Sequence, residues 1–422
     1  MENKKIKILT LGDHPLSPSG VGTQTRYVCQ ALLRTGRYEI LSLGGAIKHQ
    51  DYSLRSVEEF GQDWKIQPVD GYGTPEMIRS ILRNQRPDIV WIMTDPRFYV
   101  WLWQIENEVR ALCPLVYYHV WDNYPYPMLN KNYYESNDHI ATISKLTDDI
   151  VKNVAPNVPR SYIPHAVDNE VFISLPPEER ERLRKQNLNE LEKDKFIVFW
   201  NNRNARRKQS GTLLFWWKDW LEKRNFKDEA TLIMHTDPKD VHGQDLNHIV
   251  HELGLTSRQV LFSKNKVPLE AMAAFYNMAD VTVNISDAEG FGLATLESLS
   301  CGTPIIATMT GGLQEQIIGD GGPFGVPLFP VSKAIIGSQE VPYIYEDRLN
   351  KDHFLSALDN LYDMGADERR KLGELGRQHV MKNYNFKDFN SRWVDLMDSV
   401  YQKCGSWETR QGYNGINFKE VA

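Results

Sequence analysis

The chain alternates short, continuously apolar runs with longer stretches whose apolar positions recur at helical spacing. The first apolar runs are IKILTLG, YEILSLGG and DIVWIMT, and they are separated by GTQTRYVCQALLRTG and EMIRSILRNQ. Buried strands alternating with helices are typical of βαβ units, in which helices cover both faces of a parallel sheet. The rhythm continues through PLVYYHV, DHIATIS and SYIPHAV to near Asp168. The pattern predicts a first Rossmann-like domain over residues 1–171.

A charged stretch with paired prolines follows at residues 172–194, FISLPPEERERLRKQNLNELEKD, and predicts a linker carrying a short solvated helix. The alternation then restarts with FIVFWNN, TLIMHT, QVLFS, VTVNIS and PIIAT, which predicts a second Rossmann-like domain over residues 195–380. The last part, residues 381–422, is expected to form a helix that crosses back to the first domain, and a tail. We therefore expect an α/β protein with two doubly wound parallel-sheet domains facing across a cleft and C-terminal helices packing across both.

Composition agrees with a water-soluble protein, because 41% of the 422 residues are hydrophobic and 25% are charged. The chain has no apolar run near the ~20 residues that span a bilayer and no signal-peptide pattern, so we expect a cytoplasmic protein without a transmembrane segment. The four cysteines form no CxxC pair and suggest neither a zinc site nor disulfides. A net charge of -6 argues against generic binding to nucleic acid.

The motif with the most chemistry is SDAEGFGLATLESLSCGTPIIATMTGGLQEQI, residues 286–317. The apolar strand before it delivers Asp287 and Glu289 to the carboxyl end of a parallel sheet, where ligands bind in such folds. Gly290 and Gly292 allow the backbone to approach a ligand closely.

A helix is expected to begin near Phe291, so that its first N–H groups face a ligand. Seven residues separate Glu289 from Glu297, which places one acid at the predicted helix start and the other about two turns in. The two acids are then able to contact different parts of one extended ligand.

This E-x7-E element, with the GTPII strand and the GG-x-x-E turn behind it, resembles the retaining glycosyltransferases of family 4, whose fold is GT-B. The resemblance implies a hexosyltransferase-type enzyme that uses a UDP- or GDP-sugar. It also implies that Glu289 lies near the transferred sugar and Glu297 binds the ribose. The amides around Phe291, Gly292 and Leu293 would meet sugar hydroxyls or phosphate, and we count Asp287 and Gly290 among the donor-binding residues.

Two basic residues, Arg203 and Lys208, follow the first strand of the second domain in FIVFWNNRNARRKQSG. Cations at this position would stabilise the negative charge that builds on a departing nucleotide diphosphate. Members of the family carry an arginine, four intervening residues and a lysine here, which implies that Arg203 and Lys208 bind the diphosphate. Arg206 and Arg207 are interpreted as a solvated loop.

The first domain offers a glycine-containing loop in GDHPLSPSGVGTQTRYV, where Gly20 and Gly22 open a predicted helix and form an anion site from backbone amides. By resemblance, this loop lies over the donor phosphates and the acceptor.

The strand PLVYYHV ends at His119, and the resemblance implies that this histidine contacts the donor sugar. Trp121, Asp122 and Tyr124 follow it and are candidates for acceptor binding, with Asp122 orienting a hydroxyl. Upstream, the spacing of Phe98 and its neighbours predicts core positions in a helix.

No D-x-D element is present to bridge a diphosphate to a cation, so we expect no metal and no cofactor beyond the nucleotide sugar. A glycan is the preferred acceptor. A hydroxylated base in DNA is the second choice, because Arg206 and Arg207 would extend a phosphate-binding surface. A nucleotide-sugar epimerase and a non-catalytic nucleotide-sugar-binding protein are the alternatives of other classes. The sequence specifies neither the acceptor nor the oligomeric state.

Overall fold

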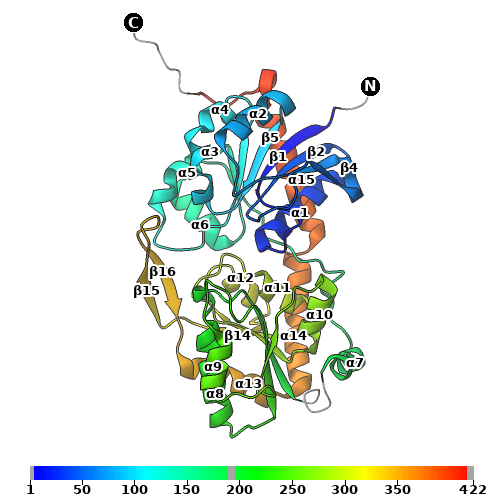
Figure 1. Ribbon diagram of the computed structural model, residues 1–422, viewed down its shortest axis with the longest axis vertical. Coiled ribbons are helices and arrows are strands. Elements are labelled where there is room, and N and C mark those ends of the chain that lie inside the picture. The colour runs from blue at the N-terminus through cyan, green and yellow to red at the C-terminus, as the bar shows by residue number, and fades with distance from the viewer. Residues whose placement is uncertain (1–3, 189–194, 416–422) are drawn as a thin grey trace. The chain divides into compact units, whose positions relative to one another are not determined.

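The computed structural model describes residues 4–188 and 195–415, which form two compact units. The N-terminal unit comprises Met1–His165 and Lys387–Ala422, and the C-terminal unit comprises Ala166–Phe386. Each unit is built on its own mainly parallel sheet flanked by helices, as the sequence predicts (Figure 1). The end of the predicted linker, 189–194, and the end of the predicted tail, 416–422, lie outside the described residues.

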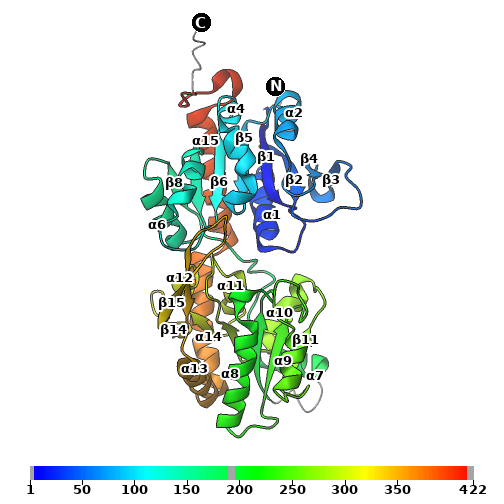
Figure 2. The same cartoon turned by 60° about the vertical axis from the view of Figure 1, so that its left-hand side comes forward.

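The N-terminal unit contains an eight-stranded sheet of order β3-β4-β2-β1-β5-β6-β7-β8, in which only β3 and β4 pair antiparallel. The central strands lie side by side in both views (Figure 1 and Figure 2). The core strand β5 is buried along its whole length, which explains its unbroken apolar sequence. The strands are β1 (Ile6–Asp13), β2 (Tyr38–Gly45), β3 (Arg55–Val57), β4 (Gly61–Pro68), β5 (Ile89–Met93), β6 (Leu115–His119), β7 (His139–Thr142) and β8 (Arg160–Tyr162).

Helices connect these strands, and the first of them begins as the sequence predicts, with Gly20 as its first residue. Ser19 is its N-cap residue, since the Ser19 side chain accepts a hydrogen bond from the Gly22 amide. The helices are α1 (Gly20–Leu33), α2 (Pro75–Gln85), α3 (Val100–Gln104), α4 (Glu106–Arg110), α5 (Lys131–Glu135), α6 (Lys145–Val154) and α15 (Phe386–Cys404).

The core position predicted for Phe98 is wrong. Its side chain is 48% exposed and stacks on Tyr72, with ring centroids 4.8 Å apart. The prediction assumed one continuous helix, but a short 3-10 turn, Pro96–Tyr99, precedes α3 and rotates the residue out of the buried face.

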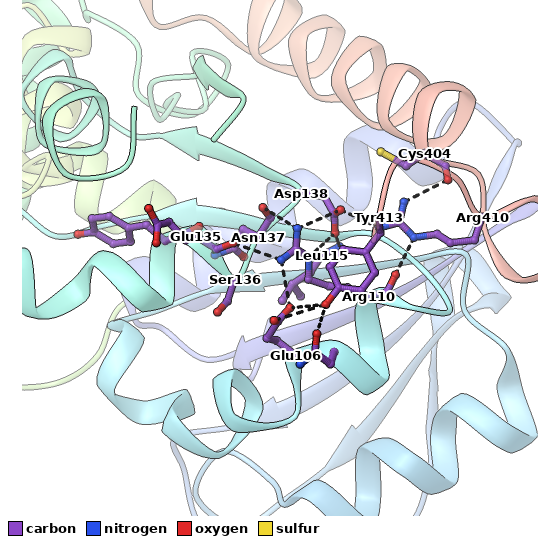
Figure 3. A network of polar contacts seen from close by, with 12 residues as sticks. Glu106, Arg110, Leu115, Glu135, Ser136, Asn137, Asp138, Cys404, Arg410 and Tyr413 are labelled. Atoms are coloured by element: carbon purple, nitrogen blue, oxygen red, sulfur yellow. Dashed lines mark hydrogen bonds and ion pairs between the residues drawn. The ribbon is translucent and has the colours of Figure 1, made fainter. Parts of the chain in front are cut away.

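The C-terminal segment belongs to the N-terminal unit and is anchored there by aromatic packing and by a buried ion-pair network. Trp393 of α15 packs edge-on against Trp91 of β5 at 5.8 Å between ring centroids. Arg410 Nη2 lies 2.7 Å from Asp138 Oδ1, and the Asp138 carboxylate also pairs with Arg110 Nε at 3.1 Å (Figure 3). The side chains of Arg410 and Asp138 are only 5% and 7% exposed, so this network is shielded from water.

The C-terminal unit contains a six-stranded, fully parallel sheet of order β11-β10-β9-β12-β13-β14. Its first strand in the chain, β9, is central, so the winding reverses there and leaves a switch point at the carboxyl ends of β9 and β12. A separate antiparallel hairpin joins β15 to β16. The strands are β9 (Phe196–Asn201), β10 (Ala230–His235), β11 (Val260–Ser263), β12 (Val281–Asn284), β13 (Ile305–Thr308), β14 (Gly325–Leu328), β15 (Ser332–Ile336) and β16 (Ile344–Arg348).

The core of this unit is rich in tryptophan, with Trp200, Trp217 and Trp220 all fully buried. The helices are α7 (Pro177–Asn187), α8 (Ser210–Lys223), α9 (Leu246–Glu252), α10 (Leu269–Met278), α11 (Leu293–Ser300), α12 (Leu313–Ile317), α13 (Lys351–Asp363) and α14 (Gly365–Asn383). Among the described residues, no helix is both long and apolar enough to span a bilayer.

The charged stretch expected to be a solvated linker does form a helix, α7, but two of its side chains are not surface residues. Arg180 donates to the backbone oxygen of Cys301, and Arg184 pairs with Asp280 at 2.9 Å. The sequence pattern alone could not separate these arginines from the exposed charges around them.

Candidate functional site

The loop after β12 carries Asp287 and Glu289, the first acid of the E-x7-E element, and both side chains are buried, at 4% and 6% exposed. The helix that follows begins at Leu293, two residues after the predicted start near Phe291. Gly292 adopts φ +90°, a left-handed conformation that interrupts the backbone and makes this glycine the N-cap. Glu289 therefore lies in the loop, four residues before α11, while Glu297 lies within the helix.

Two cations from the turn after β9 form ion pairs with Glu289. Lys208 Nζ contacts Glu289 Oε1, and Arg207 Nη1 lies 3.0 Å from Glu289 Oε2. The side chains of Lys208 and Glu289 are 10% and 8% exposed. The interpretation of Arg207 as part of a solvated loop is therefore wrong, because its guanidinium reaches inward to the buried acid.

This environment fixes the charge of Glu289. Burial by itself raises the pKa of the carboxyl, but the attraction of Lys208 and Arg207 outweighs burial and lowers the pKa to about 2. Glu289 is therefore a permanent carboxylate at neutral pH, and the ion pairs it makes are available at every pH at which an enzyme normally works.

The pKa of Glu297, the second acid, is shifted in the opposite direction to that of Glu289. Its Oε2 accepts a 2.7 Å hydrogen bond from the Tyr276 hydroxyl, which in turn accepts a 2.8 Å hydrogen bond from Asn201 Nδ2. Burial raises the pKa of Glu297 to about 7, while the hydrogen bond from Tyr276 opposes the rise. The pKa values of these two carboxyl groups are thus shifted in opposite directions, and such divergent pairs are typical of functional sites.

Asp287 links the loop to the hairpin. Its Oδ2 accepts from Gln209 Nε2 at 2.6 Å and pairs with Arg348 of β16 at 3.0 Å. Burial raises the pKa of Asp287 to about 6, and the Gln209 hydrogen bond and Arg348 oppose that rise. Neither Gln209 nor Arg348 was found by sequence reasoning, since no local motif connects them to Asp287.

A second contact ties the hairpin to the basic turn. Arg206 donates two hydrogen bonds, of 2.8 and 2.6 Å, to Glu346, whose side chain is 2% exposed. The side chain of Arg206 is 58% exposed, as expected of a solvated loop, but its guanidinium is also held by this buried acid. The turn at residues 206–209 therefore contacts both the hairpin of β15 and β16 and the loop at residues 285–292, called the acidic loop below.

The two cations expected to act together have different partners. Arg203 is 59% exposed in its side chain and pairs with Asp240, with 2.6 Å between Nε and Oδ2, whereas Lys208 is buried against Glu289. Arg203 thus keeps a solvent-accessible guanidinium, and Lys208 is part of the acidic cluster.

The backbone under the acidic loop is shaped by the double glycine of the GG-x-x-E turn. Gly311 has φ +51°, and a Cβ added there would lie 1.6 Å from the carbonyl oxygen of Glu289. The amide of Gly312 donates a 3.1 Å hydrogen bond to the same oxygen. Only glycine allows this approach, so the double glycine positions Glu289, a role that the sequence alone did not assign.

In the N-terminal unit, one backbone amide of the glycine loop after β1 already has a hydrogen-bond partner within that loop. Gly22 N donates to Ser19 Oγ at 2.9 Å, and Ser19 Oγ donates to Asp13 at 2.6 Å. A Cβ on Gly22 would lie 2.3 Å from Ser17 Oγ, which explains the glycine at this position by packing. The Gly22 amide already has a partner, while Gly20 begins α1.

His119 ends β6 as predicted and is fully buried. Its Nε2 lies 2.6 Å from the Tyr134 hydroxyl, and Nδ1 is buried without a hydrogen-bond partner among the described residues. Burial lowers the pKa of His119 to about 3, so the imidazole is neutral. A ligand reaches Nδ1 only if the side chains packed over it move.

The acceptor candidates beyond β6 differ in exposure. Trp121 is buried and donates through Nε1 to the carbonyl oxygen of Asn123 at 3.0 Å, while Asp122 is half-buried. Tyr124 donates from its hydroxyl to Asp149 at 2.7 Å.

Metal-binding potential can be read from side-chain clustering. Within residues 4–188 and 195–415, the histidine, cysteine and acidic side chains form no group of three or more that could hold a metal ion.

Part of this geometry lies in a segment of the chain that matches a family model. Residues 179–322, which include the turn after β9 and the whole acidic loop, match the family model of glycosyl transferases group 1. A D-inositol 3-phosphate glycosyltransferase from Paenarthrobacter aurescens is 29% identical over 136 residues, which is 32% of this chain and 28% of the relative. The enzyme of that name from Corynebacterium urealyticum is 43% identical over 72 residues, or 17% of this chain and 16% of the relative. The chain therefore aligns with less than a third of either relative.

Solved structures resemble the whole fold. Sucrose-phosphate synthase from Thermosynechococcus elongatus superposes with a TM-score of 0.74 at 17% identity, covering 94% of this chain and 100% of that protein. HepE from Anabaena, in complex with UDP and glucose, gives a TM-score of 0.69 at 15% identity, covering 93% of this chain and 100% of that one. Together the comparisons support a relationship to the group 1 glycosyltransferases and establish the GT-B type of fold, with two Rossmann-like domains.

Proposed function

We propose that this chain is a retaining glycosyltransferase that moves a sugar from a nucleotide diphosphate sugar to an acceptor hydroxyl. The observation that carries the proposal is the buried cluster of Glu289, Lys208 and Arg207 at the carboxyl ends of β9 and β12, inside the segment that matches the family model. Carboxyl ends of parallel strands at a switch point are where ligands bind in such sheets. Because a similar structure holds UDP and glucose, UDP-glucose is the first donor to test.

The chemistry follows from where charge develops. The bond between the anomeric carbon and the diphosphate oxygen breaks, the acceptor oxygen bonds to the same face of that carbon, and the acceptor proton passes to the departing diphosphate. Lys208 and Arg203 stabilise the leaving group, because positioned cations are most effective against charge that appears in the transition state. The fixed carboxylate of Glu289 stabilises the positive charge on the sugar, so no enzymic nucleophile is required.

Glu297 has the complementary role of a hydrogen-bonding partner to the ribose. Its raised pKa and its contact with Tyr276 fit a carboxyl group that binds neutral hydroxyls and not a cation. In the N-terminal unit, His119 and the glycine loop are proposed as donor-binding residues, and Asp122 as the residue that orients the acceptor.

The direct test measures donor binding and turnover. A nucleotide sugar that binds the native state raises the unfolding temperature in proportion to its occupancy, and UDP-glucose is expected to do so. Glu289→Gln should lower nucleotide release about 100-fold or more, the cost of losing one positioned charge in an active site. Glu252→Gln, at an exposed acid of α9, serves as the matched control and should keep the wild-type rate. Wild-type turnover in Glu289→Gln, or no stabilisation by any nucleotide sugar, would refute the proposal.

A glycan is the proposed acceptor. The case for a DNA base depended on Arg206 and Arg207 forming a phosphate-binding surface, but carboxylates of Glu346 and Glu289 already engage both guanidinium groups. Inositol phosphate belongs in the acceptor screen because the aligned relatives carry it in their names. Isomerisation of the donor in the absence of any acceptor would instead identify an epimerase.

Metal independence is part of the proposal, since lysine and arginine supply the positive charge near the leaving group. Turnover with the identified donor and acceptor is expected to be unchanged after EDTA treatment. A loss of activity that Mg²⁺ or Mn²⁺ restores would contradict this part while leaving the transferase proposal standing.

A further inference from the structure

The C-terminal unit contains a cavity of about 320 Å³ at the amino ends of its central strands. Asp280 and Pro304, which directly precede β12 and β13, line it, as do α7 and the first turn of α14. The acidic loop lies at the other ends of these strands, because Asp287 and Glu289 follow β12. The cavity is thus separated from the proposed donor site by the length of the sheet.

Positive charge dominates this cavity. Arg180 and Arg184 of α7 and Arg369 and Arg370 of α14 all line it. The acids among the lining residues are Glu181 and Asp280, so four guanidinium groups face two carboxylates. Arg370 and Glu181 are exposed, whereas Arg180, Arg184 and Arg369 are buried or half-buried and share Asp280 as the shielded carboxylate of the lining. Positive charge held away from water is costly without an anion to neutralise it.

Backbone oxygens accept part of the hydrogen bonds that these guanidinium groups offer: Arg180 donates to Leu175 and Cys301, Arg184 to Met278, and Arg369 to Leu361. One carboxylate, Asp280, serves both Arg184 and Arg369, at 2.9 and 3.1 Å, and also accepts from the amide of Ile197 at 2.8 Å. Arg369 is only 9% exposed, and its Nε is buried without a hydrogen-bond partner among the described residues. Unsatisfied buried donors of this kind call for an explanation, and an unseen ion is one of the recognised causes.

The electrostatics of Arg180 agree with this description. Burial lowers the pKa of its guanidinium and the nearby charges of Arg184 and Arg370 lower it further, while Cys301 and Asp280 oppose the shift. An anion placed between α7 and α14 would relieve both effects, because it would compensate the lost hydration and screen the repulsion.

We propose that this cavity is a binding site for a phosphate dianion, either as free phosphate or as a phosphomonoester, distinct from the donor site. A tetrahedral dianion accepts hydrogen bonds from several guanidinium groups at once, which planar, charged donors of this type provide. The start of α14 at the cavity wall adds the positive end of a 19-residue helix to the arginines. The volume accommodates a phosphate with a small organic group attached.

Isothermal titration of the full-length protein with inorganic phosphate, at an ionic strength held constant with sodium chloride, tests the proposal. Arg370→Gln is the principal variant, because its side chain is 48% exposed and, among the described residues, its ion-pair partner is the exposed Asp367, so the fold should tolerate the change. Its affinity for phosphate should fall about tenfold, the usual effect of losing one charge-assisted hydrogen bond. Glu181→Gln removes a lining negative charge and should raise the affinity.

Two controls separate this site from other anion binding. Arg392→Gln, at an exposed position on α15, should bind phosphate as the wild type does, and so should Lys208→Ala in the proposed donor site. A parallel titration with methyl phosphate distinguishes the sources, since tighter binding than inorganic phosphate identifies a monoester ligand and weaker binding identifies the free ion.

The proposal is overturned if wild-type protein binds no phosphate, or if Lys208→Ala abolishes binding while Arg370→Gln leaves it unchanged. The second outcome would place the anion at the donor site. Neither result depends on transferase activity, so this test and that of the proposed function fail separately.

Discussion

Replacing Glu297 with glutamine should change the pH dependence of stability in a way that reports directly on the burial of this acid. Burial raises the pKa of Glu297 to about 7 in the folded protein, whereas the ordinary value is 4.5. The folded state therefore holds the proton more tightly than the unfolded state. The free energy of unfolding of the wild type consequently falls as pH rises from about 4.5 to about 7, and the loss is complete above that range.

The magnitude follows from the shift. A difference of about 2.5 pKa units corresponds to about 3 kcal/mol, since each unit is worth about 1.4 kcal/mol. Glutamine resembles the protonated acid in shape, and its amide oxygen still accepts the hydrogen bond from Tyr276. The variant lacks the titration, so its stability relative to the wild type should rise by about 2 to 3 kcal/mol between pH 5 and pH 8.

Urea denaturation of both proteins at pH 5, 6, 7 and 8 measures this difference, and subtracting one curve from the other cancels the other titrating groups. Glu289→Gln, in the loop that precedes α11, is the matched control. Because Lys208 and Arg207 keep the pKa of Glu289 at about 2, that variant should be destabilised by the same amount at every pH in the series. A stability difference for Glu297→Gln that does not vary with pH would show that the carboxyl is ionised in the folded state and that the reasoning is wrong.

Two further predictions concern the buried ion pair of Arg410 in the N-terminal unit and the glycine at position 311 in the C-terminal unit. Arg410→Ala should destabilise the N-terminal unit by about 3 kcal/mol in urea, because it leaves a carboxylate that is 7% exposed without one of its partners. Arg86→Ala, in an exposed pair with Glu408, should cost less than about 1 kcal/mol, and equal losses in the two variants would contradict the role assigned to burial. Gly311→Ala should cost about 3 kcal/mol or more and lower turnover, because the new Cβ would overlap the carbonyl oxygen of Glu289. Gly321→Ala, also at a positive φ but with nothing within 4 Å, should cost about 1 kcal/mol and leave turnover unchanged, and a tolerated Gly311→Ala would disprove the packing argument.

The sequence was sufficient for features that depend on neighbouring residues. Alternating apolar and helical segments predicted two parallel-sheet units, because a strand buried on both faces must be apolar throughout and the helices between strands must be amphipathic. It also predicted that Gly20 opens a helix, that His119 ends a strand, and that the acids at 287 and 289 follow one. Each of these follows from residues within one element and the turn beside it.

Local pattern was misleading where backbone conformation changed within a few residues. The glycine at 292 adopts φ +90° and delays the helix, so the first acid of the pair lies in a loop and not at a helix start. The 3-10 turn before α3 exposes Phe98. In both cases a short irregular segment changed the side-chain direction that a regular periodicity implies.

Tertiary structure alone decided which charges meet. Lys208 and Glu289 are 81 positions apart, and Arg206 and Glu346 are 140 apart, so no spacing rule relates them. The sequence of α7 has the composition of a solvated helix, and only the packing of α7 beside Asp280 makes Arg184 a half-buried ion-pair partner. Hydrophobic periodicity is a property of each element by itself, whereas ion pairing, burial and the resulting pKa values are set by whichever distant segments the fold brings into contact. For that reason the sequence determined the architecture and the identity of the acidic motif, and the three-dimensional structure determined the protonation of its acids and the partners that hold them.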